Sequence, residues 1–183
     1  MNGMISMQPK KRGKYTKKFI NHYCVLDLET TGLSWKEDQI IEIGILKIRN
    51  NKIVQQYSQL INPKQKISLF ITHLTGITNE MIINAPYLED IKKDIIEFIG
   101  QDTIVGHNTS FDLNFLANGL NIDIHNEYVD TLYLSRKAYP QLKHHRLSDM
   151  VQFLHLSQNE HRALADCIAT YELYEHIKRK EEA

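Results

Sequence analysis

The chain has 183 residues, of which 42% are hydrophobic and 24% are charged, a composition that excludes wholesale disorder and suits one domain with its own core. The longest apolar runs span only a few residues, which argues against a membrane segment, and no secretory signal is visible. We therefore expect a cytoplasmic protein in which Cys24 and Cys167 are reduced and buried, with no thiolate zinc site.

The charges are distributed unevenly, although the formal net charge is zero. Six of the 22 basic side chains and none of the 22 acidic ones fall in the first 18 residues, which leaves the rest of the chain formally negative. We expect residues 1–19 to form a flexible basic segment, either a solvated tail or an arm that attracts phosphate. Residues 20–180 should form a single domain whose acidic balance could hold cations.

The predicted elements begin with strands and continue with helices. Residues 22–28, 39–49 and 52–60 are expected to form three antiparallel strands, with a turn at Asn50–Asn51 between the second and the third. A short strand is expected at residues 103–105. Helical spacing and stop signals predict helices over residues 79–83, 87–99, 110–118, 130–138, 148–154 and 162–179. This order predicts an α/β fold with a mixed sheet covered by helices.

The first candidate motif is the pair Asp27 and Glu29 at the end of the first of these strands. Residues two apart in a strand face the same side, so the two carboxylates should project together. Each would raise the pKa of the other unless a cation lies between them. Taken alone, such a pair is more often a solvated strand end than a site.

Two further acidic residues begin apolar rows on predicted helices. Asp112 has Phe115 and Leu116 on its own helix face, and Asp166 lies near the start of the last helix, close to His161. Burial of either carboxylate without a partner would be costly. The alternative for Asp112 is a carboxylate that is favoured at a helix start by the helix dipole. The alternative for His161 is a structural or solvated side chain, which is the usual role of a histidine near a helix start.

Together these residues place four carboxylates where burial would be unfavourable without a counter-charge. Oxygen ligands of this kind suit Mg²⁺ or Mn²⁺ better than Zn²⁺. Two such ions can bind both the attacking and the leaving oxygen of a phosphodiester displacement.

The three motifs resemble those of the DEDDh 3′→5′ exonucleases, a family that includes the epsilon proofreading subunit of bacterial DNA polymerase III and ribonuclease T. The resemblance covers about residues 21–179 and rests on the segments at residues 27–33, 107–116 and 161–169. It implies a ribonuclease H-like fold. A sister group has tyrosine four residues before the last aspartate; here Arg162 holds that position and His161 stands five before, which indicates the histidine type.

The resemblance also implies a mechanism and a set of site residues. Two Mg²⁺ or Mn²⁺ ions would be held by Asp27, Glu29, Asp112 and Asp166, and His161 would act as general base, releasing nucleoside 5′-monophosphates. The family also implies contacts with the terminal nucleotide. The matching positions in this sequence are Thr30, Thr31, Gly32, Leu33, Ile77, His107 and Asn108. Leu33 is expected to act as a wedge beside the last base. The group His144, His145 and Arg146 could touch phosphate or form an exposed loop.

Several alternatives remain open from the sequence alone. The expected partner is a single-stranded or frayed 3′ end of nucleic acid, with DNA favoured over RNA, in replication or repair. An RNA-trimming enzyme of the same fold or a non-catalytic nucleic-acid-binding module are the alternatives. Association with a polymerase is possible, but no long C-terminal tail follows the last predicted helix. No membrane partner is expected.

Overall fold

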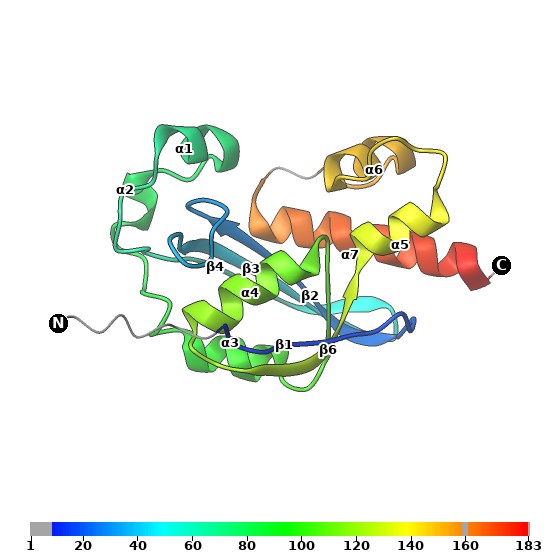
Figure 1. The fold of residues 1–183 in the computed structure, drawn as a ribbon, viewed down its shortest axis with the longest axis horizontal. Coiled ribbons are helices and arrows are strands. Elements are labelled where there is room, and N and C mark those ends of the chain that lie inside the picture. Colours follow the sequence, from blue (N-terminus) through cyan, green and yellow to red (C-terminus); the bar gives the residue numbers. More distant parts are fainter. Residues whose placement is uncertain (1–8, 159–160, 183) are drawn as a thin grey trace.

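The computed structural model describes residues 9–158 and 161–182 and centres on one six-stranded mixed sheet (Figure 1). Its spatial order is β1-β6-β5-β2-β3-β4. The pairs β2–β3 and β3–β4 are antiparallel, whereas β2–β5, β5–β6 and β1–β6 are parallel. The strands are β1 (Arg12–Tyr15), β2 (His22–Thr30), β3 (Ile40–Arg49), β4 (Lys52–Leu60), β5 (Thr103–Gly106) and β6 (Ile124–Asp130).

Helices cover both faces of the sheet. They are α1 (Leu69–Thr75), α2 (Asn79–Ile82), α3 (Lys92–Ile99), α4 (Thr109–Gly119), α5 (Thr131–Ala138), α6 (Leu147–Leu154) and α7 (Ala163–Glu182). Successive side chains of a strand point to opposite faces of the sheet, so neighbouring residues of β2 belong to two different cores. Val25 belongs to a core shared with α5, α6 and α7, whereas Cys24 and Leu26 belong to a core shared with α3 and α4. Each fully buried aliphatic side chain contributes roughly 1.5–3 kcal/mol to these cores.

The middle of the sheet holds β2, which pairs with both β3 and β5 and is buried along most of its length. Since β2, β5 and β6 run parallel, their carboxyl ends meet at one edge of the sheet. At that edge lie the end of β2, which bears the first motif, and the end of β5, after which the second motif begins. The last helix, α7, starts beside the same edge. Residues far apart in the chain are thereby brought to one place.

A glycine in β3 lets α7 approach the sheet closely. Gly44 pairs with Asp27 in the β2–β3 ladder. A Cβ atom at Gly44 would lie 2.5 Å from the carbonyl carbon of Ala163, the first residue of α7. Any side chain larger than hydrogen would therefore push the start of α7 away from Asp27.

The structure corrects the prediction for the N-terminal segment. Residues 1–19 were expected to be flexible, but Arg12–Tyr15 form β1, which pairs in parallel with β6. Residues 1–8 lie outside the described residues. The helix α1 and the strand β6 were not predicted, and the helix expected at residues 87–99 begins only at Lys92. Among the described residues, no helix combines the length and the apolar character needed to cross a membrane.

Candidate active site

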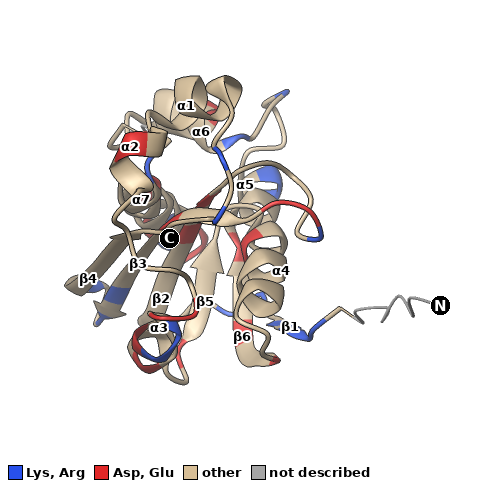
Figure 2. Ribbon diagram, turned by 90° about the vertical axis from the view of Figure 1, so that its left-hand side faces the viewer, with Lys and Arg blue, Asp and Glu red and all other residues tan. Residues whose placement is uncertain are grey.

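The centre of the site is the carboxyl end of β2. Asp27 and Glu29 have the same strand parity and stand opposite Gly44 and Glu42 on β3. Both carboxylates are half-buried, and Figure 2 shows acidic ribbon gathered around this end of the sheet. The predicted projection of the two acids from one strand end agrees with this register.

The third carboxylate is brought to β2 by the start of α4. Asp112 is 4% exposed, and its Oδ1 accepts a hydrogen bond of 3.1 Å from the backbone N–H of Leu28, the residue between the two strand acids. The chain turns into α4 at Asn108, which has a φ of 66°. The apolar row after Asp112 therefore packs under the sheet while the carboxylate itself reaches β2.

The fourth carboxylate and the histidine come from the start of α7. Asp166 lies in its first turn and is 7% exposed, and His161 is exposed two residues before the helix. Ligand atoms of Glu29, His161 and Asp166 all lie within 4.8 Å of one another. Three of the five predicted catalytic side chains, from the first and third motifs, thus meet in one small volume. Asp27 lies close enough to Asp112 and Asp166 for their charges to raise its pKa.

The electrostatics of this volume favour a cation. Burial raises the pKa of Asp27, and the carboxylates of Asp112 and Asp166 raise it further. Burial also raises the pKa of Asp112. Burial, followed by the charge of Asp166, raises the pKa of Glu29 to about 8. Without a counter-charge these acids hold protons that a metal ion would displace.

The donor set fits a divalent metal. Four carboxylates and one imidazole offer hard oxygen donors and a single nitrogen, which is the chemistry that Mg²⁺ and Mn²⁺ accept. The two cysteines are buried and free, as predicted, and Cys167 donates to the carbonyl oxygens of Val25 and Gly44. A thiolate zinc site is therefore not part of this cluster.

One buried charged residue beside the site was missed by sequence reasoning. Glu42 is 2% exposed, and its carboxylate accepts hydrogen bonds from Arg162 Nε at 3.0 Å, from Arg162 Nη2 at 2.6 Å and from the backbone N–H of Ala163 at 2.9 Å. These bonds tie the start of α7 to β3 directly opposite Glu29. The signal in the sequence was a glutamate inside an isoleucine-rich strand, where an unpaired charge would be costly.

The end of β2 and the loop after it contain four of the predicted nucleotide contacts, Thr30, Thr31, Gly32 and Leu33. Leu33 is 87% exposed, so its side chain is available to contact a base. Thr31 accepts hydrogen bonds from Gln39 N and Gln65 Nε2, and Thr30 donates to the carbonyl oxygen of Gly32. The turn is therefore held internally, while the contacts of residues 30–33 with a nucleotide remain a prediction.

Two predicted substrate residues are engaged elsewhere. Ile77 is 0% exposed and packs with Ile41 and Ile71, so its side chain is not presented to a base. His107 has Nδ1 2.9 Å from Thr131 Oγ1, and its Nε2 donates to the carbonyl oxygen of His145 at 2.9 Å. Both nitrogens are occupied within the protein, so the expected contact of His107 with sugar or phosphate is not supported.

Asn108 is the one member of this group that stays exposed. Its backbone N–H donates to Asp130 Oδ1 at 2.9 Å, which leaves its side chain at the surface beside α4. A contact with the substrate therefore remains a prediction for Asn108.

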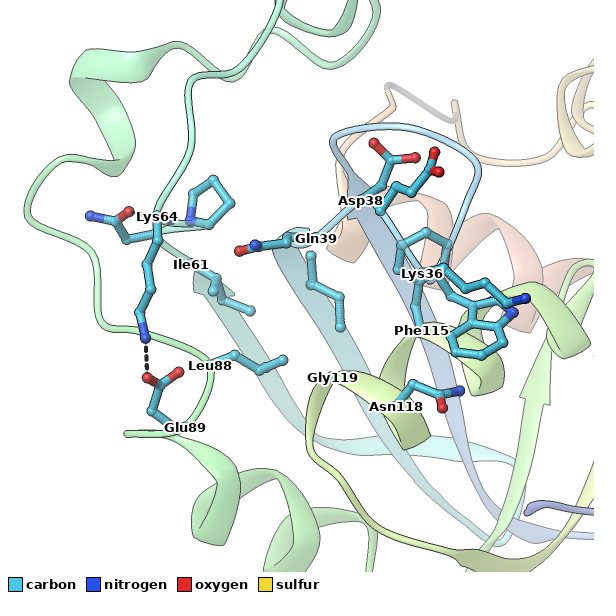
Figure 3. A pocket seen from close by; sticks show the side chains of 15 residues that line it. Lys36, Asp38, Gln39, Ile61, Lys64, Leu88, Glu89, Phe115, Asn118 and Gly119 are labelled. Carbon is cyan, nitrogen blue, oxygen red and sulfur yellow. Dashed lines mark hydrogen bonds and ion pairs between the residues drawn. The ribbon is translucent and has the colours of Figure 1, made fainter. Parts of the chain in front are cut away.

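One cavity lies away from the carboxylates. It has a volume of about 680 Å³ beneath the loop at residues 35–40, and Figure 3 shows Ile61, Leu88 and Phe115 among the side chains around it. None of the four acids lines it. The carboxylates predicted to carry the chemistry therefore lie at the end of β2 and not in this cavity.

Comparisons with known proteins agree with this geometry. A family model described as Exonuclease (RNase T) matches residues 24–174. The chain is 39% identical over 170 residues to DNA polymerase III PolC-type of Caldanaerobacter subterraneus subsp. tengcongensis, covering 91% of this chain and 12% of that protein. It is also 39% identical over 154 residues to the PolC-type polymerase of Bacillus subtilis, covering 81% of this chain and 11% of that protein. The chain thus spans about an eighth of these relatives.

Solved structures show the same fold. Exonuclease X in complex with 5′ overhanging duplex DNA superposes with a TM-score of 0.72 at 27% identity, covering 88% of this chain and 93% of that one. The nuclease domain of 3′hExo, described as a DEDDh family member and bound to rAMP, gives 0.73 at 17% identity, covering 92% and 96%. The ribonuclease H-like fold and the DEDDh resemblance are confirmed. The chain belongs to the RNase T family of exonucleases.

Proposed function

We propose that this chain is a 3′→5′ exonuclease domain that uses two divalent metal ions to release nucleoside 5′-monophosphates from nucleic-acid ends. One observation carries the proposal: Glu29, Asp166 and His161 meet within 4.8 Å, close to the half-buried Asp27 and the buried Asp112. Burying so many acids together is unfavourable unless cations bind them.

Asp27, Glu29, Asp112 and Asp166 would hold the ions, here proposed to be Mg²⁺ or Mn²⁺, which supply Lewis-acid activation of water and stabilise charge on the leaving oxygen. His161 would accept the proton of the attacking water. The exposure of His161 supports this role, because water and a substrate end could both reach an exposed ring. A group that exchanges protons near neutral pH suits this role.

The terminal nucleotide would be held by the turn after β2. The exposed side chain of Leu33 would lie against the last base, and the backbone of Thr30, Thr31 and Gly32 would line the sugar. Since these contacts are made by backbone and by one apolar side chain, they favour a free or frayed strand end over a paired one.

We propose DNA as the substrate, ahead of RNA. Relatives at 39% identity are DNA polymerases of the PolC type, and Exonuclease X was solved with DNA. A proofreading or repair role follows from the same likeness, as does association with a polymerase. The cytoplasmic location predicted from the sequence stays a prediction.

The test is digestion of matched 5′-labelled DNA and RNA, single-stranded and duplex, with Mg²⁺, with Mn²⁺ and with chelator. We expect a ladder that shortens from the 3′ end by single nucleotides, only with metal, and faster on DNA. The Asp112→Asn variant is the control and should leave every strand intact. Faster cleavage of RNA than of DNA would favour the alternative of an RNA-trimming enzyme. Strands that stay intact with both metals would contradict the proposed activity and favour a non-catalytic nucleic-acid-binding module.

A further inference from the structure

A second hollow lies next to the start of α4 and carries a different charge. It has a volume of about 370 Å³ and is lined by basic side chains from the end of α5 and from the loop before α6, together with residues His107 and Asn108. The basic side chains are Arg136, Lys143, His144, His145 and Arg146, and no acidic residue lines the hollow. Figure 2 shows basic ribbon on α5 at this side of the sheet.

Three of these basic side chains have no ion-pair partner in the described part of the chain. Within residues 9–158 and 161–182, no ion pair involves Arg136, Lys143 or Arg146. By contrast, Lys47 and Arg49 on β3 share the carboxylate of Asp102 at 2.8 Å. Three uncompensated charges around one concave surface repel one another and favour an anionic ligand.

The wall of the hollow is fixed by hydrogen bonds. His107 Nε2 donates to the carbonyl oxygen of His145, and the ring Nε2 of His145 donates to the carbonyl oxygen of Tyr139 at 3.0 Å. The backbone N–H of Arg146 donates to Asp149 at 2.9 Å. The occupied nitrogens of His107 therefore hold the basic loop against the end of β5, so the cations are presented on a preformed surface.

The hollow is close to the acids because of the sheet topology. The strand β5 ends at Gly106, one residue before His107, and β6 ends at Asp130, directly before α5. Both strands run parallel to β2 and follow it in the sheet. Neighbouring strands lie about 4.8 Å apart, so the hollow begins one to two strands from the end of β2 that bears Asp27.

We propose that this basic hollow binds backbone phosphates of the substrate strand, on the 5′ side of the bond that is cut. The inference rests on the proposed function, since the acids fix where the 3′ end lies. The anions along a nucleic-acid strand are its backbone phosphates, which guanidinium and ammonium groups bind. Such contacts carry no sequence preference. His107 then acts as a positioning residue for the loop and not as a substrate contact.

The experiment removes the three charges and measures binding and turnover separately. The test variant is Arg136→Gln, Lys143→Gln and Arg146→Gln combined. The matched control changes three exposed basic residues elsewhere, Lys52→Gln, Lys93→Gln and Arg179→Gln. Binding of a labelled single strand of about 12 nucleotides is followed by anisotropy between about 50 and 200 mM salt, in an Asp112→Asn background so that the strand stays intact. Turnover is measured with Asp112 present, on the strand and on thymidine 5′-(p-nitrophenyl phosphate), which has one nucleotide.

We expect the test variant to bind the strand at least about tenfold more weakly at the lowest salt, with a salt slope lower by about 2, because each phosphate contact with a single strand contributes about 0.7. The control should bind within about twofold of the parent. Turnover of the one-nucleotide ester should be unchanged, since it cannot reach the hollow.

Equal salt slopes in the test variant and the parent would overturn the inference, as would an equal decrease in the control. Equal losses on both substrates would also overturn it, because the charges would then act through the reaction centre. If the parent hydrolyses neither substrate, the proposed function fails, while the salt slopes still decide whether the hollow binds the strand.

Discussion

The carboxylate cluster should make the metal-free protein lose stability as the pH rises. Glu29 illustrates the effect, because burial and the charge of Asp166 raise its pKa from 4.5 to about 8. A group whose pKa is higher in the folded state binds its proton more tightly there than in the unfolded chain. Its contribution to stability is therefore complete below pH 4.5 and is lost as the pH rises through about 8.

The size of this loss follows from the same two values. Each tenfold change in proton affinity corresponds to about 1.4 kcal/mol, so Glu29 alone should lower the free energy of unfolding by about 4 kcal/mol between pH 4.5 and pH 8. Burial shifts Asp27 and Asp112 in the same direction. Since a domain is typically stable by only about 5–15 kcal/mol, this loss should dominate its pH dependence without metal.

The assay is urea unfolding at pH 5, 6, 7 and 8 in chelator, followed by circular dichroism and by the fluorescence of Trp35, the single tryptophan. We expect the unfolding free energy to fall with pH in the parent and to fall less in Glu29→Gln, whose side chain carries no charge. Glu37→Gln, which changes an exposed acid in the next loop, serves as the control. Mn²⁺ should restore stability at pH 8 in the parent.

Identical pH profiles for the parent and Glu29→Gln in chelator would refute the reasoning. Such a result would mean that the acid already has a counter-charge or is solvated when folded. Comparing the two proteins cancels the contribution of other titrating groups. One of these is His107, whose pKa is lowered by burial and whose effect on stability has the opposite sign.

Three further outcomes are expected. His161→Ala should lower turnover by about 10²–10⁴-fold while the melting temperature stays unchanged, because the side chain is exposed; unchanged turnover would remove it as general base. Asp112→Asn should abolish metal-dependent turnover yet raise the melting temperature in chelator at pH 8, and a lower melting temperature would contradict the burial argument. Glu42→Gln should cost roughly 1.5–3 kcal/mol of stability through weaker bonds to Arg162 and should lower turnover more than substrate affinity, as unfolding and steady-state kinetics can show.

Local patterns in the sequence were enough to predict most of the fold. The predicted strand at residues 52–60 matches β4, and the predictions at 39–49 and 103–105 differ from β3 and β5 by one residue. The strand β3 is rich in isoleucine and ends at a turn whose residues, Asn50 and Asn51, have positive φ. The pattern is local, so it can be read without knowing what lies opposite each strand.

The missed strands depend on non-local pairing. Two of the four residues of β1, Arg12 and Lys14, are basic, and the strand carries no apolar alternation. It nevertheless pairs in parallel with β6, more than a hundred residues later. Gly13 allows this contact, because a Cβ there would lie 2.3 Å from the carbonyl oxygen of Asn126. Neither strand has a sequence signal strong enough by itself, since each is completed by the other.

The site shows the same division between local and non-local information. The acids were recognised because carboxylates in apolar rows conflict with burial, a conflict visible one segment at a time. The role of Glu42 could not be seen in this way, because its reason for being buried is Arg162, which lies 120 residues further along the chain. The internal hydrogen bonds of His107 could not be predicted for a related reason: its partners Thr131 and His145 lie 24 and 38 residues further along the chain.

The organisation of the site explains why its instability is tolerated. The β2 acids are held apart from solvent by two helix starts, and each start is fixed by a bond that does not depend on metal: Leu28 N–H to Asp112 for α4, and Ala163 N–H to Glu42 for α7. Gly44 removes the side chain that would separate α7 from the sheet. The repulsion among the acids therefore cannot relax by moving the helices without breaking these bonds. The repulsion is relieved only when the acids bind protons or cations. At neutral pH with divalent ions present, we expect cations to bind in place of protons. Metal binding is thereby coupled to the stability of the whole fold.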